Sequence, residues 1–200
     1  MHNSFFQFEK KFMAVLATPS PRLFHFSAGA IGAWEIKSIL NIKGDGLPLA
    51  PRLDVTSILP ENPAAWTLSG ATSNERYVTR TEKTALVQKQ EGLSRPDAFR
   101  AVLIPIKKSG DWWALTQDER RDVLEAQSRH IEIGLRYLPP IARRLHHCRD
   151  LSFVQPFDFL TWFEFSPSDE SLFVELLEAL RATPEWRFVE REVEVRLERD

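Results

Sequence analysis

A single cysteine, Cys148, occurs among the 200 residues of the sequence, so no disulfide bond can form within the chain. A reducing compartment is therefore allowed, although the count does not require one. No apolar run approaches the length that a membrane-crossing helix needs, and neither low-complexity segments nor short tandem repeats occur. The charges nearly balance, with 26 Lys and Arg residues against 28 Asp and Glu residues. This balance argues against a nucleic-acid-binding surface, which needs a concentrated excess of basic residues.

What is present is the composition of an ordinary globular protein. Hydrophobic residues make up 43% and charged residues 27% of the chain, enough to bury a core in one large or two small domains. At the N-terminus, Lys10 and Lys11 precede an apolar run at residues 12–17, but this run is shorter than the core of a secretory signal and follows Glu9. We therefore expect residues 1–20 to form a flexible leader and the protein to be cytoplasmic.

The first half of the chain shows the period-two pattern of half-buried strands. After a short apolar start at residues 23–26, a helix is expected at residues 82–91, and Gly92 is expected to end it in the left-handed conformation that is usual there. A weak duplication into two sheet-forming halves would have its boundary near residues 94–99. The apolar residues on alternate positions are Trp34, Ile36, Leu40 and Ile42, then Leu53 and Val55, then Trp66 and Leu68.

The second half predicts elements in the order β-α-β-β-α-β, the split βαβ arrangement called ferredoxin-like. Thr116 and Glu119 have the spacing of a capping box that begins a helix running toward His130. A second helix begins at Ser166 and Pro167 and has apolar residues at three and four spacing on one side. The predicted strands are residues 101–106, 141–148, 157–165 and 188–197.

One face of this predicted sheet needs a cover besides the helices. Phe157, Phe159, Thr161, Phe163 and Phe165 alternate on one side of a strand, and a bare sheet would expose a larger apolar patch than monomeric proteins tolerate. Pairing with the N-terminal sheet, with a second subunit, or with a flat apolar cofactor would each provide the cover.

The residues that could carry chemistry lie between Trp112 and Arg149. Taken alone, His130 would be a hydrogen-bonded core or surface histidine, and Arg143 a solvated strand residue paired with a carboxylate. Their spacing favours another interpretation. The chain resembles the chlorite dismutase family, in which a haem-binding histidine is followed by glycine four, tyrosine seven and arginine thirteen positions on. The matching residues are His130, Gly134, Tyr137 and Arg143, flanked by the similar segments IPIKKSGDWW and PFDFLTWFEF.

The resemblance is dense from Ser73 to Asp200, and it implies a haem b protein in which His130 binds the iron. Neutral imidazole is the commonest axial ligand of haem iron, and one such ligand leaves the opposite position open for reaction. Arg143 would lie on that open side as the catalytic residue. A related coproporphyrin-processing family has glutamine at this position, so Arg143 discriminates between the two.

The implied reaction splits chlorite into chloride and dioxygen. It consumes no net proton, so a general base is dispensable. Ferric iron would take one oxygen atom from chlorite, leaving a ferryl species and hypochlorite, which must stay until the O–O bond forms. A guanidinium suits this task because it is cationic at any working pH and rich in hydrogen-bond donors, so it holds an oxyanion without acting as its base.

Other residues of the site follow from the same resemblance. Glu185 would accept a hydrogen bond from the iron-binding histidine and make it more electron-rich; its alternative is a helix-end carboxylate in water. Haem propionates need cationic or hydrogen-bonding partners, and Ile104 would contact the porphyrin face. The predicted propionate partners are Lys108 and Trp112 on one edge and Asn74 and Tyr77 on the other.

Several aromatic and metal-ligating residues are interpreted as structural. Core packing is favoured for Trp34, Trp66 and Trp113. His146 and Cys148 could converge, since alternate residues of a strand share a face, but no further cysteine completes a soft-metal site. The segment RDLSFVQPFDF is longer than the usual link between these strands of the family and is expected at the surface.

The expected fold class is α+β. The resemblance implies a ferredoxin-like C-terminal domain at residues 99–200 with a trimmed ferredoxin-like half at residues 21–98, together a dimeric α+β barrel. It also implies a homodimer that acts on a small anion, chlorite, with no nucleic-acid or membrane partner. The alternatives are a haem-binding or haem-sensing protein of the same fold, and a peroxidase or coproporphyrin decarboxylase.

Overall fold

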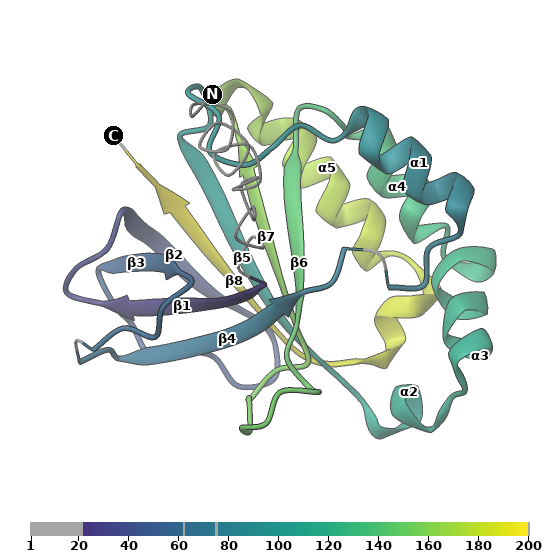
Figure 1. Cartoon of the computed structure of the whole chain (residues 1–200), viewed down its shortest axis with the longest axis horizontal. Helices are drawn as coiled ribbons and strands as arrows, with labels where there is room; N and C mark the ends of the chain where they lie inside the picture. The colour runs from purple at the N-terminus through teal and green to yellow at the C-terminus, as the bar shows by residue number, and fades with distance from the viewer. Residues whose placement is uncertain (1–21, 62, 75, 200) are drawn as a thin grey trace, which may run out of the picture.

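The computed structural model describes residues 22–199 except residues 62 and 75, and the expected leader at residues 1–20 lies outside this part. Strands β1 to β4 come first, and helices then separate the later strands except β6 and β7 (Figure 1). The strands are β1 (Leu23–Gly29), β2 (Trp34–Lys43), β3 (Arg52–Thr56), β4 (Trp66–Thr72), β5 (Arg100–Lys108), β6 (Ala142–His147), β7 (Phe159–Phe165) and β8 (Val189–Glu198). The α-helices are α1 (Arg80–Lys89), α2 (Gly110–Ala114), α3 (Gln117–Arg121), α4 (His130–Arg136) and α5 (Glu170–Arg181); a π-helix, Asp122–Gln127, follows α3, and 3-10 turns lie at Pro167–Asp169 and Pro184–Phe188.

The strands form one closed antiparallel barrel in the order β1-β3-β2-β8-β5-β7-β6-β4. In Figure 1, β1 to β4 lie on the left, β5 to β8 in the centre and the helices on the right. Strand β8 pairs with both β2 and β5, so it joins the two halves of the chain. The ring closes where β4 pairs with β6, at Ala71 with His147 and Thr72 with His146.

The strands predicted in the first half are present, but β2 departs from the predicted alternation. Its pairing with β8 shifts register between Ile36 and Ser38. Because side chains alternate between the faces of a strand, this bulge turns the next residues over. Ile39 packs against the barrel core, whereas Leu40 and Ile42 are 43% and 41% exposed.

The end of α1 corrects a second expectation. The helix stops at Lys89, and the cap residue Gln90 is extended, so the left-handed cap expected at Gly92 is wrong. The backbone N–H of Gln90 still makes the last bond of the helix, to the Leu86 carbonyl, and its side-chain amide makes a tertiary contact by donating to the carbonyl of Arg143.

The helical segment leading to His130 is broken, although one helix was expected there. The capping box of Thr116 and Glu119 is present, as predicted, and begins α3. The π-helix follows, and Arg129 then adopts the left-handed conformation with φ 52°. His130 is therefore the first residue of a new helix, α4, and not the last residue of the preceding one.

In the second half, all four predicted strands and the helix that begins near Pro167 are found, with shifted ends. These strands stand in the barrel in the order β8-β5-β7-β6, all antiparallel. Strand β7 begins at Phe159, and Phe157 precedes it and packs in the barrel core. Of the segment 149–159 predicted at the surface, residues 151–156 lie there, with Val154 97% exposed, but Phe157 and Asp158 are buried, so the prediction is wrong for its last part.

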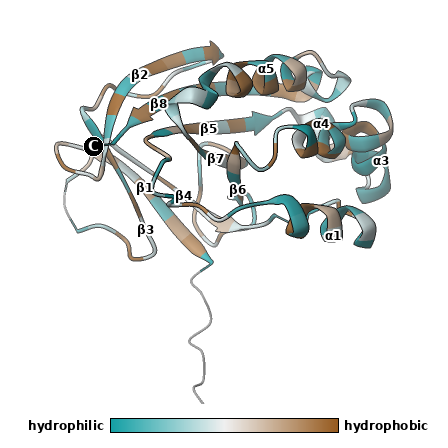
Figure 2. Cartoon of the chain, turned by 90° about the horizontal axis from the view of Figure 1, so that it is seen from above, coloured by the Kyte–Doolittle hydropathy of each residue, from teal (hydrophilic) through white to brown (hydrophobic). Residues whose placement is uncertain are grey.

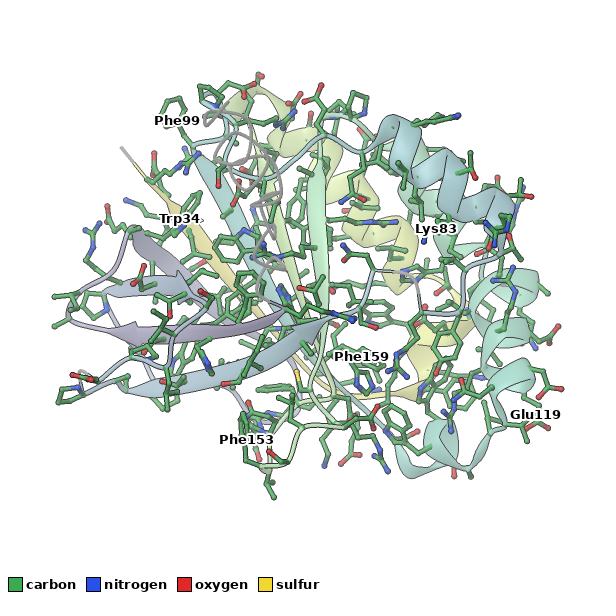
Figure 3. The ribbon with its side chains drawn as sticks, in the orientation of Figure 1. Trp34, Lys83, Phe99, Glu119, Phe153 and Phe159 are labelled. Carbon is green, nitrogen blue, oxygen red and sulfur yellow. The ribbon has the colours of Figure 1, made fainter. Side chains whose placement is uncertain are left out.

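Two apolar cores lie on opposite sides of β5, β7 and β8. The first fills the barrel and includes Trp34, Trp66 and Trp162. The second lies between these strands and α5, whose Phe173 is stacked on Phe165. Helices α5, α4 and α1 follow one another along one side of the strands (Figure 2). In Figure 3, Trp34 lies on the barrel side and Phe159 on the helix side.

The N-terminal strands are therefore the cover on one face of the C-terminal sheet, one of the three covers considered above. The alternating β7 residues Phe159, Thr161 and Phe163 lie on the opposite face, where they line a pocket. Among the described residues, no helix is both long and apolar enough to cross a membrane.

Candidate haem pocket

A pocket lies between the helices and the outer face of β5, β7 and β6. It encloses about 1110 Å³ of free space, part of it open to solvent. The sequence prediction placed eight residues at one site, and the structure brings all of them to this pocket. They are Asn74, Tyr77, Ile104, Lys108, Trp112, His130, Arg143 and Glu185.

His130, Glu185 and Lys108 form a bonded set at one side of the pocket. The Nδ1 atom of His130 lies 2.7 Å from Oε2 of Glu185, and Nζ of Lys108 lies 2.7 Å from Oε1. Burial opposes the charge on Glu185, but attraction and hydrogen bonding from His130 and Lys108 outweigh it and lower its pKa to about 2. The carboxylate is therefore ionised at neutral pH, and it holds the histidine ring with Nδ1 engaged and Nε2 free.

The break before α4 positions this histidine. The N–H of Ile131 donates to the carboxylate of Glu125, and the N–H of Glu185 donates to the hydroxyl of Ser128. These bonds supply acceptors to backbone groups that a helix start leaves unpaired. Arg129 keeps its left-handed conformation beside them. A π-helix and a strained residue next to each other are common at functional sites.

Arg143 enters the pocket from β6. Part of its surface faces the cavity, but enough protein surrounds the guanidinium that burial lowers the pKa to about 10. It remains a cation at neutral pH. Within the described part of the chain, no carboxylate forms an ion pair with it and no side-chain hydrogen bond engages it. An unpaired cation in an apolar pocket favours binding of an anion.

The edge of the pocket carries two buried donors without acceptors among the described residues, the hydroxyl of Tyr77 and Nε1 of Trp112. Tyr77 also has an unusual left-handed backbone, with φ 64°. Its ring meets that of Trp112 edge-on, with centroids 6.4 Å apart. Buried polar groups normally have partners, so these two donors fit the carboxylates that a haem would bring.

Three further residues of the predicted site lie as follows. Oδ1 of Asn74 accepts a hydrogen bond from the N–H of Leu145, which ties the segment after β4 to β6. Ile104 is 2% exposed and presents an apolar surface on β5. The ammonium of Lys108 is already bound to Glu185 and lies over the ring of Trp112 at 4.7 Å, so its predicted propionate contact stays a prediction.

Sequence reasoning missed other lining residues. Phe159, Thr161 and Phe163 were assigned to one strand face, and the shared period with Ile104 could have placed them at the site. Further lining residues include Arg76, Leu86 and Gln90, which come from the segment between β4 and β5, and Trp186, which follows Glu185. No periodic signal marks Arg76 and Gln90.

His146 and Cys148 lie in the barrel, away from this pocket. Both side chains approach Gly70, where an added Cβ would lie 2.6 Å from Cβ of His146 and 3.2 Å from Sγ of Cys148. Burial lowers the pKa of His146 to about 3 and raises the pKa of Cys148. In the described ranges, no three His, Cys, Asp or Glu side chains gather as a metal site would require. Trp113, predicted to be core, is only partly buried and stacks on Phe159.

Comparison with known proteins agrees with this geometry. Residues 51–197 match the model of the family described as chlorite dismutase. The chain belongs to the chlorite dismutase family. Chlorite dismutases are haem enzymes in general, and the His130 and Glu185 pair, the unpaired Arg143 and the two free donors fit such a group.

A dimeric chlorite dismutase from Nitrobacter winogradskyi is 49% identical, with a TM-score of 0.82 over 88% of this chain and 99% of that one. A chlorite dismutase from Candidatus Nitrospira defluvii, solved in complex with imidazole, is 27% identical, with a TM-score of 0.53 over 72% of this chain and 56% of that one. A curated chlorite dismutase from Ideonella dechloratans is 32% identical over 123 residues, 60% of this chain. The match spans 40% of that longer protein.

Proposed function

We propose that this chlorite dismutase family member is a haem b enzyme that decomposes chlorite to chloride and dioxygen. One observation carries the proposal. Arg143, a cation that no described carboxylate neutralises, faces the same pocket as His130, whose ring is held by Glu185. A small anion and a metal bound by an imidazole would both be accommodated there.

When bound, haem supplies the iron at which an oxygen atom leaves chlorite, with hypochlorite as a transient product. His130 would hold that iron through Nε2, because its Nδ1 is bonded to Glu185. A carboxylate partner fixes the ring orientation and raises the basicity of the metal-binding nitrogen. Lys108 keeps Glu185 ionised without removing it from the histidine, since the two partners use different oxygens.

Arg143 would retain the anions on the reactive side. Its charge attracts chlorite, and its planar set of N–H donors can hold an oxyanion in a pocket where little water screens the charge. Because the guanidinium stays protonated, it neither removes nor supplies a proton. Such retention would keep hypochlorite in the pocket for the rest of the reaction.

The remaining predicted residues would anchor the cofactor. The hydroxyl of Tyr77 and Nε1 of Trp112 would donate to haem propionates, with Asn74 on the same rim. Ile104 would contact the macrocycle face, as expected from its buried position on the pocket side of β5.

We also propose how the subunits assemble and how the chain divides into domains. The dimeric relative supports a homodimer. The strand order β8-β5-β7-β6 with intervening helices supports a ferredoxin-like unit at residues 99–200, with residues 21–98 as its trimmed counterpart. The cytoplasmic location stays a prediction from the sequence.

The deciding experiment adds chlorite to the purified, haem-loaded protein and records dioxygen with an oxygen electrode. One dioxygen and one chloride per chlorite are expected. Haem binding without dioxygen release would instead favour a haem-binding or haem-sensing protein. Oxidation of a peroxidase dye, or decarboxylation of a coproporphyrin, without chlorite turnover would favour the third class.

A further inference from the structure

Glu192 on β8 is a buried carboxylate that the proposed haem site does not use. It is 1% exposed, and the described lining of the pocket does not include it. Its Oε1 atom accepts two hydrogen bonds, at 2.6 Å and 2.9 Å, from the guanidinium of Arg181, the last residue of α5. Its Oε2 atom accepts a third, at 2.8 Å, from Nε1 of Trp186. The two oxygens of Glu192 therefore hold two different segments of the chain.

The charges around Glu192 cost free energy to bury. Glu194, which is 2% exposed, accepts hydrogen bonds from Arg181 at 2.7 Å and from Arg196 at 2.6 Å. Two carboxylates with almost no contact with water thus share two guanidinium groups. Replacing such a buried cluster with apolar residues of similar volume is often neutral or even stabilising. The cluster is therefore weak evidence for stability, and the contact with Trp186 indicates another role.

The turn Pro184–Phe188 connects Glu192 with the proposed haem site. Glu185 of this turn accepts the hydrogen bonds from the site, and the next residue, Trp186, donates to Glu192. The ring of Trp186 also lies 5.7 Å from the ammonium of Lys108, the second partner of Glu185. Because the two neighbouring residues share one short 3-10 turn, fixing the indole limits how far the adjacent carboxylate moves.

We propose that Glu192 is a positioning residue for Glu185. Glu192 holds the indole of Trp186 and so fixes the turn from which Glu185 reaches His130. A carboxylate partner makes a metal-binding histidine more basic. The strength with which His130 donates electrons to a bound iron thus depends on a carboxylate outside the pocket. This inference rests on the proposed role of His130 as the iron ligand.

Two variants weaken this link, and a matched control leaves it intact. Trp186→Phe keeps an aromatic ring but removes the N–H donor. Glu192→Gln keeps the size of the side chain, but the NH2 end of its amide cannot accept a hydrogen bond, so one of the present donors loses its acceptor. Trp162→Phe is the control. Nε1 of Trp162 also donates to a buried carboxylate, that of Glu164 at 2.8 Å, but Trp162 packs in the barrel core.

A first measurement follows hydrogen exchange of the full chain by mass spectrometry, with or without haem. The backbone N–H of Glu185 donates to the hydroxyl of Ser128, so exchange in the peptide that covers the turn reports its opening. Relative to peptides of β5, this exchange should be about tenfold faster in Trp186→Phe and Glu192→Gln, the effect of losing a hydrogen bond to a charged group. In Trp162→Phe the ratio should match wild type. An unchanged ratio in Trp186→Phe would overturn the proposal.

The second measurement records the iron–histidine stretching frequency of the haem-loaded, ferrous protein by resonance Raman spectroscopy. A less basic histidine forms a weaker bond to iron, so the frequency should fall in Trp186→Phe and in Glu192→Gln. It should stay at the wild-type value in Trp162→Phe. In the Glu185→Gln background, Trp186→Phe should cause no further shift. An unchanged frequency in Trp186→Phe, or an equal shift with and without Glu185, would overturn the proposal.

Failure of this inference and failure of the proposed function give different results. If the protein took up no haem, or showed no iron–histidine band, the proposed function would be wrong. The exchange rates would then still decide whether Glu192 fixes the turn. Release of dioxygen from chlorite by the wild type, together with unchanged exchange in Trp186→Phe and Glu192→Gln, would leave the proposed function intact and overturn the role of Glu192.

Discussion

The imidazole of His130 and the carboxylate of Glu185 are bonded at 2.7 Å although 55 positions separate them in the sequence. Glu185 is held in turn by Lys108 and by the hydroxyl of Ser128. The turn before β8 therefore sets the orientation of the His130 ring, which would bind iron in the proposed function.

Replacing Glu185 with glutamine should weaken haem binding. The amide keeps the shape of the side chain but removes the charge that makes His130 a stronger donor, and such changes typically cost about 10-fold to 100-fold in metal affinity. Transfer of haem to apomyoglobin measures the loss. Glu190→Gln is the matched control, because Glu190 is exposed at the start of β8, shortly after Glu185, and pairs with Lys107 at the surface. Equal rates of haem transfer from both variants would show that Glu185 does not support haem binding.

The same carboxylate should make stability depend on pH. Its folded-state pKa of about 2 lies below the ordinary value of 4.5, so its contribution is present above about pH 4.5 and is lost as the pH falls toward 2. A shift of this size corresponds to about 3 kcal/mol. Urea unfolding between pH 2 and 7 measures it. The double variant Glu185→Gln with Lys108→Met removes both charges and should flatten this part of the curve; an unchanged slope would contradict the assignment.

Arg143 variants should retain haem but be inactivated by chlorite after fewer turnovers than the wild type. Arg143→Ala removes the group that holds hypochlorite, so the haem should bleach after fewer turnovers, and Arg143→Lys should keep part of the protection. The rate is expected to fall about 10-fold to 100-fold in the alanine variant, as for a lost charge-assisted hydrogen bond. Oxygen yield and the haem absorption band are recorded together. Arg136→Ala, on the exposed side of α4, is the control. Wild-type yield in Arg143→Ala would show that the arginine retains nothing.

Tyr77→Phe tests the predicted propionate contact in two directions. The hydroxyl is buried without an acceptor among the described residues, so its removal should stabilise the haem-free protein by about 1 kcal/mol or more. With haem bound, the same change should speed haem loss, because a donor to a propionate is missing. Chemical unfolding and haem transfer give the two results. Stabilisation in both states would contradict a propionate contact.

The core between the sheet and α5 should respond to truncation of a single ring. Phe173 is fully buried and contacts the rings of Phe163 and Phe165. Phe173→Ala is expected to lower the free energy of unfolding by about 3–5 kcal/mol. Val87→Ala on α1, where the side chain is 71% exposed, should change it by less than about 0.5 kcal/mol. Similar losses for both would show that α5 does not hold this core together.

The strands of the second half could be predicted because burial selects apolar residues along them; β5, β7 and β8 lie between two apolar cores. The bulge in β2 could not, since it depends on pairing with β8, far away in the sequence. The end of α3 and the break before His130 were also missed. They are stabilised by tertiary partners, such as the carboxylate of Glu125 on the N–H of Ile131, and local propensity contains no sign of them.

The site was predicted through residues whose spacing has a chemical reason. His130 and Arg143 come from a helix and a strand that follow one another directly, so their separation in the sequence carries geometric information. Arg76 and Gln90 come from the irregular segment that covers the pocket, where side-chain direction is set by contacts such as that of Gln90 with the Arg143 carbonyl. The periodicity of the sequence cannot predict where such residues point.

Strand β8 lies between β2 and β5, and its residue Glu198 pairs with Glu35. During synthesis on the ribosome, β2 therefore cannot pair with β8 until nearly the whole described chain has emerged. Contacts between distant parts of a chain form slowly because a long loop must close first. A haem bound as proposed would therefore enter a pocket that is complete only after the last strand has closed the ring.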